Sequence, residues 1–426
     1  MNVAVRATAD ASSLNPLQRC VLGAVVVIAA VLAWRGALGV PFLFDDTKAI
    51  VENPTIRSLA RIGDVLSPPV GGTGVAGRPI VNLTLALDFA FGGLDPRGYH
   101  ATNLLLHAAA ALLLFGFVRR TLRRTRLAGS ADVVGVAVAM VWSVHPLQTE
   151  SVACVIQRTE LLAGFFLLLT LYAFARGIEE PRSRLWPVVS VAASALGMAS
   201  KEIMVVAPVL AVFLLQARGF SFLAERRVWV VLVLTVIGLL PLVAMTLLFG
   251  QANVQSVVAI ADTPASRNTL AGWVWYARQL PGMVGWIPLA LALSGFRESL
   301  ADRTGRFRPG ERMLFVLWVV VCYLALSFIE LKEARHATIL LVPVALWAAM
   351  GLAWFAQLIP AARAVLPVAA ALGLAAFSLL AQPVPREEGY REAVERAAAA
   401  APKDSVVLFS GKRDGSFVFN MRTVSG

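Results

Sequence analysis

Long apolar runs separated by short polar segments dominate the chain and predict membrane-spanning helices. A helix needs about 20 apolar residues to cross ~30 Å of hydrocarbon. About eleven candidate runs lie near residues 20–40, 99–118, 131–146, 152–175, 185–199, 203–217, 228–249, 271–295, 313–329, 336–357 and 364–381. The pattern therefore predicts an all-α polytopic integral membrane protein. Residues 1–381 are expected to form the transmembrane domain, and residues 382–426 a short outer C-terminal segment.

The first outer loop, residues 41–98, is the longest connection before the C-terminal segment. Loops of this length in compact proteins are usually functional or disordered. Within it, residues 80–91 have helical apolar spacing interrupted by Asn82 and Asp88, which predicts an interfacial helix. This helix either covers the bundle or contacts substrate directly.

Composition supports the membrane assignment, since 58% of the 426 residues are hydrophobic and only 15% are charged. The formal net charge of +12 is explained more simply by arginines facing anionic lipid than by nucleic-acid binding, which we exclude. Cys20, Cys154 and Cys322 are too widely spaced for a disulfide framework or a metal site. The run after Arg19 is expected to remain as an uncleaved first span.

Arginine clusters predict the orientation of the helices. With a cytoplasmic N-terminus, the clusters in segments 119–126, 176–184, 218–227 and 297–312 all lie on the cytoplasmic side, as the positive-inside rule requires. The four histidines, the five lysines and most acids then lie on the outer side. This distribution predicts a cavity open to the periplasmic face. The compactness of the chain and its lack of repeats favour a bacterial inner membrane as its location.

Ionisable residues at the outer helix ends are the candidate functional residues. Asp45 and Asp46 directly follow the first apolar run, and Lys201-Glu202 and Arg335 lie in short turns between apolar helices. Such residues at a membrane border usually mark substrate pathways or catalytic sites. The simpler alternatives are that the two acids only end the first helix, and that the cations only form internal salt bridges.

Polar residues also lie within the predicted helices. His100, Asn103 and His107 share one helical face at positions i, i+3 and i+7. They either line the cavity or, as the simpler alternative, form hydrogen bonds with neighbouring helices.

Six short motifs occur in a characteristic order. They are Phe44-Asp45-Asp46, Gly77-Arg78-Pro79, Tyr99-His100 with Asn103 and His107, Val144-His145-Pro146 through Glu150, Gln157-Arg158-Thr159-Glu160, and Ala199-Ser200-Lys201-Glu202. In this order the chain resembles the transmembrane, tetratricopeptide-repeat-containing O-mannosyltransferases of the C-type glycosyltransferase superfamily. The resemblance covers roughly residues 40–345. Two departures are that no repeat array follows the membrane part and that Arg335-His336 stands in place of an Arg-Tyr pair.

The resemblance implies an inverting glycosyltransferase that moves a sugar from a polyprenyl-phosphate-linked donor to a hydroxyl acceptor at the outer face. The acceptor expected first is a protein Ser or Thr, with a lipid or glycan hydroxyl left open. A hydroxyl acceptor needs a carboxylate base, and a leaving phosphate needs cations. Asp45 is the candidate base and Asp46 orients it or the acceptor, although the two roles can be reversed.

The remaining candidate site residues are assigned with this resemblance and chemistry in mind. The expected ligands of the donor phosphate are Lys201, Arg335, Arg158 and Arg78. The expected cavity or acceptor-binding residues are Glu202, His100, Asn103, His107, His145, Glu150 and Glu160.

Other ligands and functions can be weighed against this expectation. No local ligand spacing predicts a metal site, so a divalent metal is compatible with the site but not required. A glycine-rich nucleotide loop is also lacking, which disfavours a nucleotide sugar as the direct donor. The main alternative function is a transporter or flippase for a lipid-linked or anionic solute. A scaffold for an envelope assembly is the third, and it leaves the outward acidic pair unexplained.

Overall fold

The computed structural model describes residues 15–69, 73–123, 128–180, 182–217, 265–300, 309–330, 332–358 and 390–400. Every regular element within these ranges is helical, which confirms the predicted all-α class for the described part of the chain. The expected runs at 228–249 and 364–381 and most of the C-terminal segment lie outside the described residues. From that segment, one helix is described, α19 (Tyr390–Ala400).

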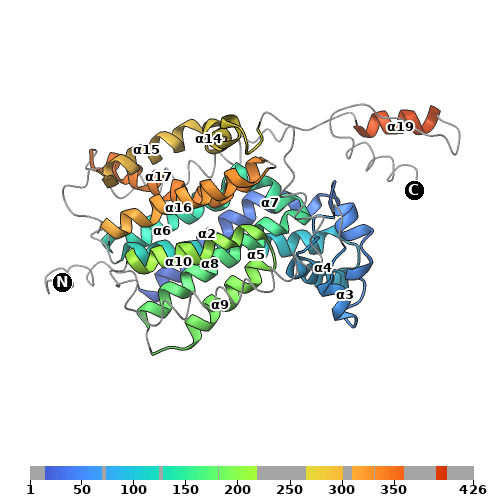
Figure 1. Ribbon diagram of the computed structural model, residues 1–426, viewed down its shortest axis with the longest axis horizontal. Coiled ribbons are helices and arrows are strands. Elements are labelled where there is room, and N and C mark those ends of the chain that lie inside the picture. The colour runs from blue at the N-terminus through green and yellow to red at the C-terminus, as the bar shows by residue number, and fades with distance from the viewer. Residues whose placement is uncertain are drawn as a thin grey trace.

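Four long elements form the centre of the helix bundle (Figure 1). They are α2 (Pro16–Trp34), α5 (Pro96–Leu122), α6 (Ala131–Val144) and α8 (Arg158–Glu179). Further helices pack around them, namely α9 (Leu185–Met198), α10 (Val206–Ala217), α14 (Trp275–Val284), α15 (Trp286–Leu300), α16 (Pro309–Phe328) and α17 (Thr338–Leu358). Short helices α7 (Thr149–Ala153) and α13 (Leu270–Trp273) connect the longer ones.

The sequence of α5 explains why this helix has its length and direction. The Asp95 side chain caps its N-terminus by accepting a hydrogen bond from the Arg97 N–H, and Pro96 occupies the first helical position. Arg119 and Arg120 lie in the last turn, where positive charge is favourable beside the unpaired carbonyls. At 1.5 Å per residue, its 27 residues extend about 40 Å, enough to cross a membrane.

Four described helices are long and apolar enough to span a membrane, or up to six if each of two bent pairs counts as one span. The expected count of eleven is therefore not confirmed. One bent pair corrects an expected continuous run, because the 271–295 run was expected to be unbroken, whereas the 131–146 run was expected to end where the first bend lies. The 131–146 run ends at His145-Pro146 with a 52° bend into α7, and the 271–295 run bends by 114° at Gly285. Gly285 has φ +88°, a conformation that an L side chain rarely adopts.

Two glycines bring α15 and α17 into direct backbone contact. A Cβ at Gly351 would lie 2.1 Å from the Leu291 carbonyl oxygen, and one at Gly295 would lie 2.0 Å from that of Trp347. Small residues at such positions allow close helix packing in membranes, where burial of apolar surface offers little driving force between helices. This pair of helices therefore depends on van der Waals contact at the two glycines.

The first outer loop folds into short helices at one end of the bundle (Figure 1). It contains η2 (Thr47–Val51), η3 (Pro54–Ile56), α3 (Ile62–Leu66) and α4 (Pro79–Gly92). The buried amide of Asn82 holds the loop together, because it donates to Thr55 Oγ1 and Val65 O and accepts from Asn53 Nδ2. Helix α4 matches the helix predicted over residues 80–91.

Candidate active site

The two adjacent acids after α2 lie in different environments. Asp46 is fully buried, whereas Asp45 is exposed. The Asp46 carboxylate accepts hydrogen bonds from the Leu43 N–H at 2.9 Å and from the Ile156 N–H at 2.7 Å. Asp46 thus joins the start of the first outer loop to the segment before α8, and leaves Asp45 pointing to solvent.

Local backbone strain lies directly beside this pair. Phe44 has φ 46°, which makes it the one non-glycine residue with positive φ among the described residues. Such strain costs of order 1–3 kcal/mol and is found most often at functional sites. The π-helix η2 follows at once, and π-turns have the same tendency. The backbone therefore holds Asp45 in a conformation that a regular helix end would not require.

Burial raises the pKa of Asp46 to about 6, although the Leu43 and Ile156 N–H groups oppose the shift by stabilising the carboxylate. The protonated form is therefore more favourable in the folded protein than in an unfolded chain. The raised pKa alone would make Asp46 a stronger base. However, Asp46 is buried and both of its oxygens accept backbone hydrogen bonds, so it is better placed to hold the turn than to reach an acceptor.

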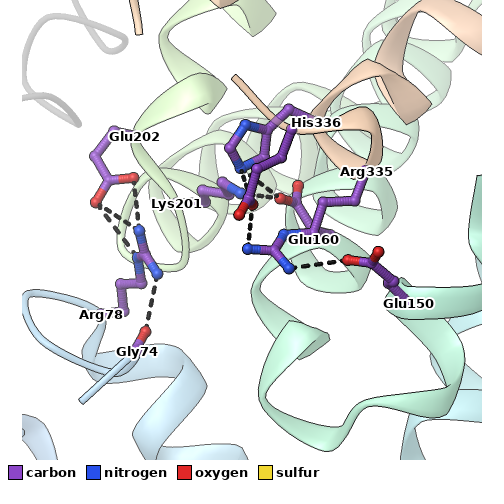
Figure 2. A network of polar contacts seen from close by, with 9 residues as sticks. Gly74, Arg78, Glu150, Glu160, Lys201, Glu202, Arg335 and His336 are labelled. Atoms are coloured by element: carbon purple, nitrogen blue, oxygen red, sulfur yellow. Dashed lines mark hydrogen bonds and ion pairs between the residues drawn. The ribbon is translucent and has the colours of Figure 1, made fainter. Parts of the chain in front are cut away.

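Three of the predicted phosphate ligands, Arg78, Lys201 and Arg335, gather in one polar network (Figure 2). Arg78 comes from the residue before α4 and bonds both Glu202 oxygens at 3.2–3.3 Å. Its guanidinium also donates to the Gly74 carbonyl at 2.8 Å. Gly74 has φ +65°, and a Cβ there would lie 2.7 Å from Ile156 Cγ1, so the turn requires glycine.

Lys201 is the buried cation of this network. Its ammonium is paired with Glu160 of α8, and His336 Nε2 lies 3.6 Å from the same carboxylate. Burial lowers the pKa of the Lys201 ammonium, while the attraction of Glu160 opposes that change. The pair is therefore internal to the protein, as the salt-bridge alternative expects, but one face of it borders a cavity described below.

Arg335 is the third cation and lies in the short turn Ala334–Ala337, directly before α17. It bonds Glu150 of α7 at 2.9 Å and is also paired with Glu333. Burial raises the pKa of Glu333, and the Arg335 guanidinium opposes that rise. Glu333 was not among the predicted site residues, and neither was His336. Their position in a charged turn beside Arg335 is the sequence signal that could have identified them.

Carboxylates outnumber cations within the network. The three cations face Glu150, Glu160, Glu202 and Glu333. An entering phosphate must therefore displace a carboxylate. Glu150 and Glu202 are the exposed partners, with side chains 61% and 49% exposed. Because these two carboxylates can be solvated when displaced, exchanging either one costs less than exchanging the buried Glu160.

An apolar cavity of about 40 Å³ adjoins the network. Its polar lining includes Glu160, Lys201 and His336, and its apolar lining comes mainly from α8, from α17 and from Ile203 and Met204 in the turn before α10. This volume suffices for about three water molecules. The cavity combines charge at one end with apolar walls elsewhere.

Asp45 lies at the same end of the molecule as Arg335. The Asp45 carboxylate and the Arg335 guanidinium both act electrostatically on the Cys154 thiol, which is itself 3.8 Å from Asp46 Oδ1. The acidic pair and the cation network thus meet around the segment that joins α7 to α8.

Arg158 has protein partners on all three guanidinium nitrogens. It is fully buried and donates to Asp88 at 2.5 Å, to Asn103 Oδ1 at 2.7 Å and to Tyr99 O at 2.7 Å. Phosphate binding would require breaking these contacts. The geometry favours a structural role that ties α8 to α4 and α5, with Asp88 as a counter-ion that the predicted set omitted.

The predicted histidines also have protein partners. His100 Nε2 lies 2.9 Å from Val40 O, and His107 Nε2 lies 2.7 Å from Ser143 O. His145 caps its own turn through the Leu147 N–H and contacts Val284 O at 3.2 Å. These contacts fit the simpler alternative, in which the histidines join neighbouring segments. Among the described residues, no group of three or more His, Cys, Asp or Glu side chains is placed to hold a metal ion.

Comparison with known proteins gives a consistent result. A model of the dolichyl-phosphate-mannose-protein mannosyltransferase family matches residues 79–245. Protein O-mannosyl-transferase TMTC4 of Homo sapiens is 30% identical over 207 residues, which is 43% of this chain and 27% of that protein. Protein O-mannosyl-transferase Tmtc2 of Drosophila melanogaster is 30% identical over 257 residues, or 57% and 26% respectively. The resemblance noted in the sequence is confirmed. The matches span about a quarter of the length of these relatives.

Solved structures show the fold. ArnT from Cupriavidus metallidurans in the apo state aligns over 94% of this chain and 84% of its own, with a TM-score of 0.56 and 16% identity. The oligosaccharyltransferase of Archaeoglobus fulgidus aligns over 89% and 55%, with a TM-score of 0.54 and 13% identity. The chain therefore shares the fold of these two proteins.

Proposed function

We propose that the chain is an inverting glycosyltransferase that moves a sugar from a polyprenyl-phosphate carrier to a hydroxyl acceptor at the outer face of the membrane. The observation that carries this proposal is the convergence of Arg78, Lys201 and Arg335 from three distant segments in one polar network, in which Lys201 also lines a cavity (Figure 2). Relatives named as protein O-mannosyl-transferases support transfer to protein Ser or Thr.

Asp45 acts as the base in this proposal. Inverting transfer requires the acceptor oxygen to attack the anomeric carbon while its proton passes to a carboxylate. Asp45 is exposed, whereas both oxygens of Asp46 accept hydrogen bonds from the protein backbone. Asp46 then holds the strained turn that presents Asp45.

The cations hold the donor phosphate. The bond between the anomeric carbon and the phosphate oxygen breaks, and negative charge develops on the leaving carrier phosphate. Fixed cations lower the barrier by stabilising that charge. Arg78 and Arg335 offer forked donors and have exposed carboxylate partners that phosphate can replace, while Lys201 supplies a buried point charge.

The carrier is a lipid phosphate in this proposal because the charged cluster adjoins apolar walls. A structure of ArnT from Cupriavidus metallidurans is described as bound to undecaprenyl phosphate, which supports the same donor class here. The positive-inside pattern supports an outer-face site, since the arginine-rich helix ends lie at the far ends of α5 and α8 from this network.

The test is sugar transfer by purified protein from synthetic polyprenyl-phosphate monosaccharides to peptides rich in Ser and Thr. General-base catalysis contributes about 10²–10⁴-fold, so Asp45→Asn should lower kcat by at least about a hundredfold. Asp64→Asn removes another exposed acid of the first outer loop and should leave the rate unchanged. Equal rates for Asp45→Asn and wild type would reject Asp45 as the base.

The same assay separates transfer from transport. An enzyme releases free polyprenyl phosphate in step with the sugar that appears on the acceptor. Movement of intact donor across a reconstituted bilayer, with its sugar-phosphate bond unbroken, would instead support the transporter or flippase alternative.

A further inference from the structure

A second charged cluster lies at the opposite end of the bundle from the candidate active site. Arg119 of α5 and the following Arg123 bond Asp132 of α6 at 2.5 and 3.2 Å, and Arg19 of α2 lies 3.9 Å from the same carboxylate. Arg120 is paired with Glu179 of α8. Four guanidinium groups thus face two carboxylates, which leaves an excess of positive charge.

Three of these arginines surround a cavity. Arg119, Arg120, Arg123 and Glu179 line a space of about 270 Å³, many times what one water molecule requires. Each of the three guanidinium groups uses one nitrogen in these ion pairs with described carboxylates. The arginine pocket, as we call this site, therefore retains unused donors and an uncompensated charge.

The arginine pocket is separate from the donor site. Glu160 and Glu179 mark the two sites on the same helix, α8, and are 19 residues apart. At 1.5 Å per residue this separation is about 28 Å, close to the ~30 Å thickness of membrane hydrocarbon. The two sites therefore lie at opposite membrane borders, and one carrier phosphate cannot occupy both.

We propose that the arginine pocket binds the phosphate of an anionic membrane phospholipid. Guanidinium forks match phosphate oxygens, and basic pockets between membrane helices accept anionic head groups. A lipid source is favoured over free phosphate because apolar side chains beside the cluster are open to acyl chains. Leu17 and Val21, which flank Arg19 on α2, are 72% and 54% exposed.

Such a lipid would stabilise the packing of the end of α5 against α6 and α8. Its phosphate offsets the repulsion between Arg119, Arg120 and Arg123, and so stabilises the folded protein without taking part in transfer. This inference does not depend on the proposed function, because it predicts a stability effect that persists in the inactive variant Asp45→Asn.

The test measures the unfolding midpoint of the detergent-purified full chain by tryptophan fluorescence. Phosphatidylglycerol, phosphatidylcholine and inorganic phosphate are each titrated into identical micelles. A ligand that binds only the folded state raises the midpoint in a saturable way. We expect phosphatidylglycerol to do so, and phosphatidylcholine and inorganic phosphate to have little effect. Equal responses to both lipids, or a full response to inorganic phosphate, would overturn the proposal.

Variants locate the effect. One charge-assisted contact contributes enough that its loss weakens binding roughly tenfold, so Arg120→Gln with Arg123→Gln should weaken phosphatidylglycerol binding about a hundredfold. Arg97→Gln is the matched control, because Arg97 is an exposed arginine near the other end of the same helix. If the double variant does not fold, Arg123→Gln alone is used, since Arg119 still pairs with Asp132. Undiminished binding in a folded pocket variant would refute the site.

Discussion

The buried ion pair between Arg158 and Asp88 gives the sharpest test of the fold. The Arg158 side chain is 0% exposed and that of Asp88 10% exposed, with 2.5 Å between Nη1 and Oδ2. Removing one partner of such a pair costs about 3–5 kcal/mol because it leaves an uncompensated buried charge. Arg158→Met should therefore lower the free energy of unfolding by that amount, and Asp88→Asn should have a similar effect.

The double variant separates this pair from general damage. Arg158→Met combined with Asp88→Asn leaves neither charge stranded. In the wild type, Thr102 donates a hydrogen bond to the Asp88 carboxylate at 2.7 Å. In the variant, Thr102 can donate to the amide oxygen of the new asparagine instead. We expect the cost of the double variant to be smaller than the sum of the two single costs by at least about 2 kcal/mol. Equilibrium unfolding in mixed detergent micelles measures all three differences.

An exposed pair in the same loop is the control. Arg61 and Asp64 lie 3.5 Å apart with side chains 63% and 53% exposed, so their coupling should stay below about 1 kcal/mol. If the destabilisation caused by Arg158→Met and by Asp88→Asn were simply additive, the coupling energy of this pair would be as small as that of the exposed pair. That result would refute the structural role. A stable Arg158→Met protein that has lost only donor affinity would return Arg158 to the phosphate-binding set.

Three further predictions follow from contacts near the site and in the bundle. Lys201→Met should destabilise the protein by leaving Glu160 buried without its ammonium partner, and Lys201→Met with Glu160→Gln should recover stability but not sugar transfer. Recovery of transfer as well would show that the pair is only a salt bridge. Asp46 has its pKa raised from 3.8 to about 6, so the folded state binds more protons than the unfolded state between these values. As pH rises from 3.8 to above 6, the free energy of unfolding of the wild type should therefore fall by about 3 kcal/mol relative to that of Asp46→Asn. A difference between the two proteins that does not change with pH would contradict the raised pKa. Gly351→Leu should lower the free energy of unfolding by at least about 1–3 kcal/mol, because the new side chain meets the Leu291 carbonyl. A backbone atom cannot move aside as the end of a side chain can. An unchanged unfolding midpoint would disprove the close approach of the two helices.

The sequence predicted the helices better than it predicted their continuity. Apolar runs located α5, α9 and α17 within a few residues. A helix that faces lipid and a helix that is buried in protein are both apolar, so hydropathy detects either kind. The bend at Gly285 within the expected 271–295 run was missed, whereas the bend at His145-Pro146 coincides with the end of the expected 131–146 run. Hydropathy averages over a window, whereas a bend depends on one residue that breaks the hydrogen-bond ladder.

The candidate site was predicted in part for a related reason. Short charged turns identified Lys201 and Arg335, and the family resemblance added Arg78; the structure brings these three residues together from distant segments. The sequence could not distinguish a cation that faces a cavity from one with every nitrogen already bonded, as in Arg158. That difference depends on Asp88 and Asn103, whose approach is set by tertiary packing.

Tertiary packing also determines the different roles of Asp45 and Asp46. Two neighbouring carboxylates at a membrane border are equivalent in sequence, yet only Asp46 reaches the Ile156 N–H across the bundle. Asp46 is fixed there, Phe44 has positive φ two residues earlier, and Asp45 between them is exposed. If Asp45 is the base, then weakening the Asp46 contact should lower kcat while leaving donor affinity intact. A variant such as Asp46→Asn that instead lowered donor affinity at constant kcat would place the acidic pair with the donor phosphate rather than with the acceptor.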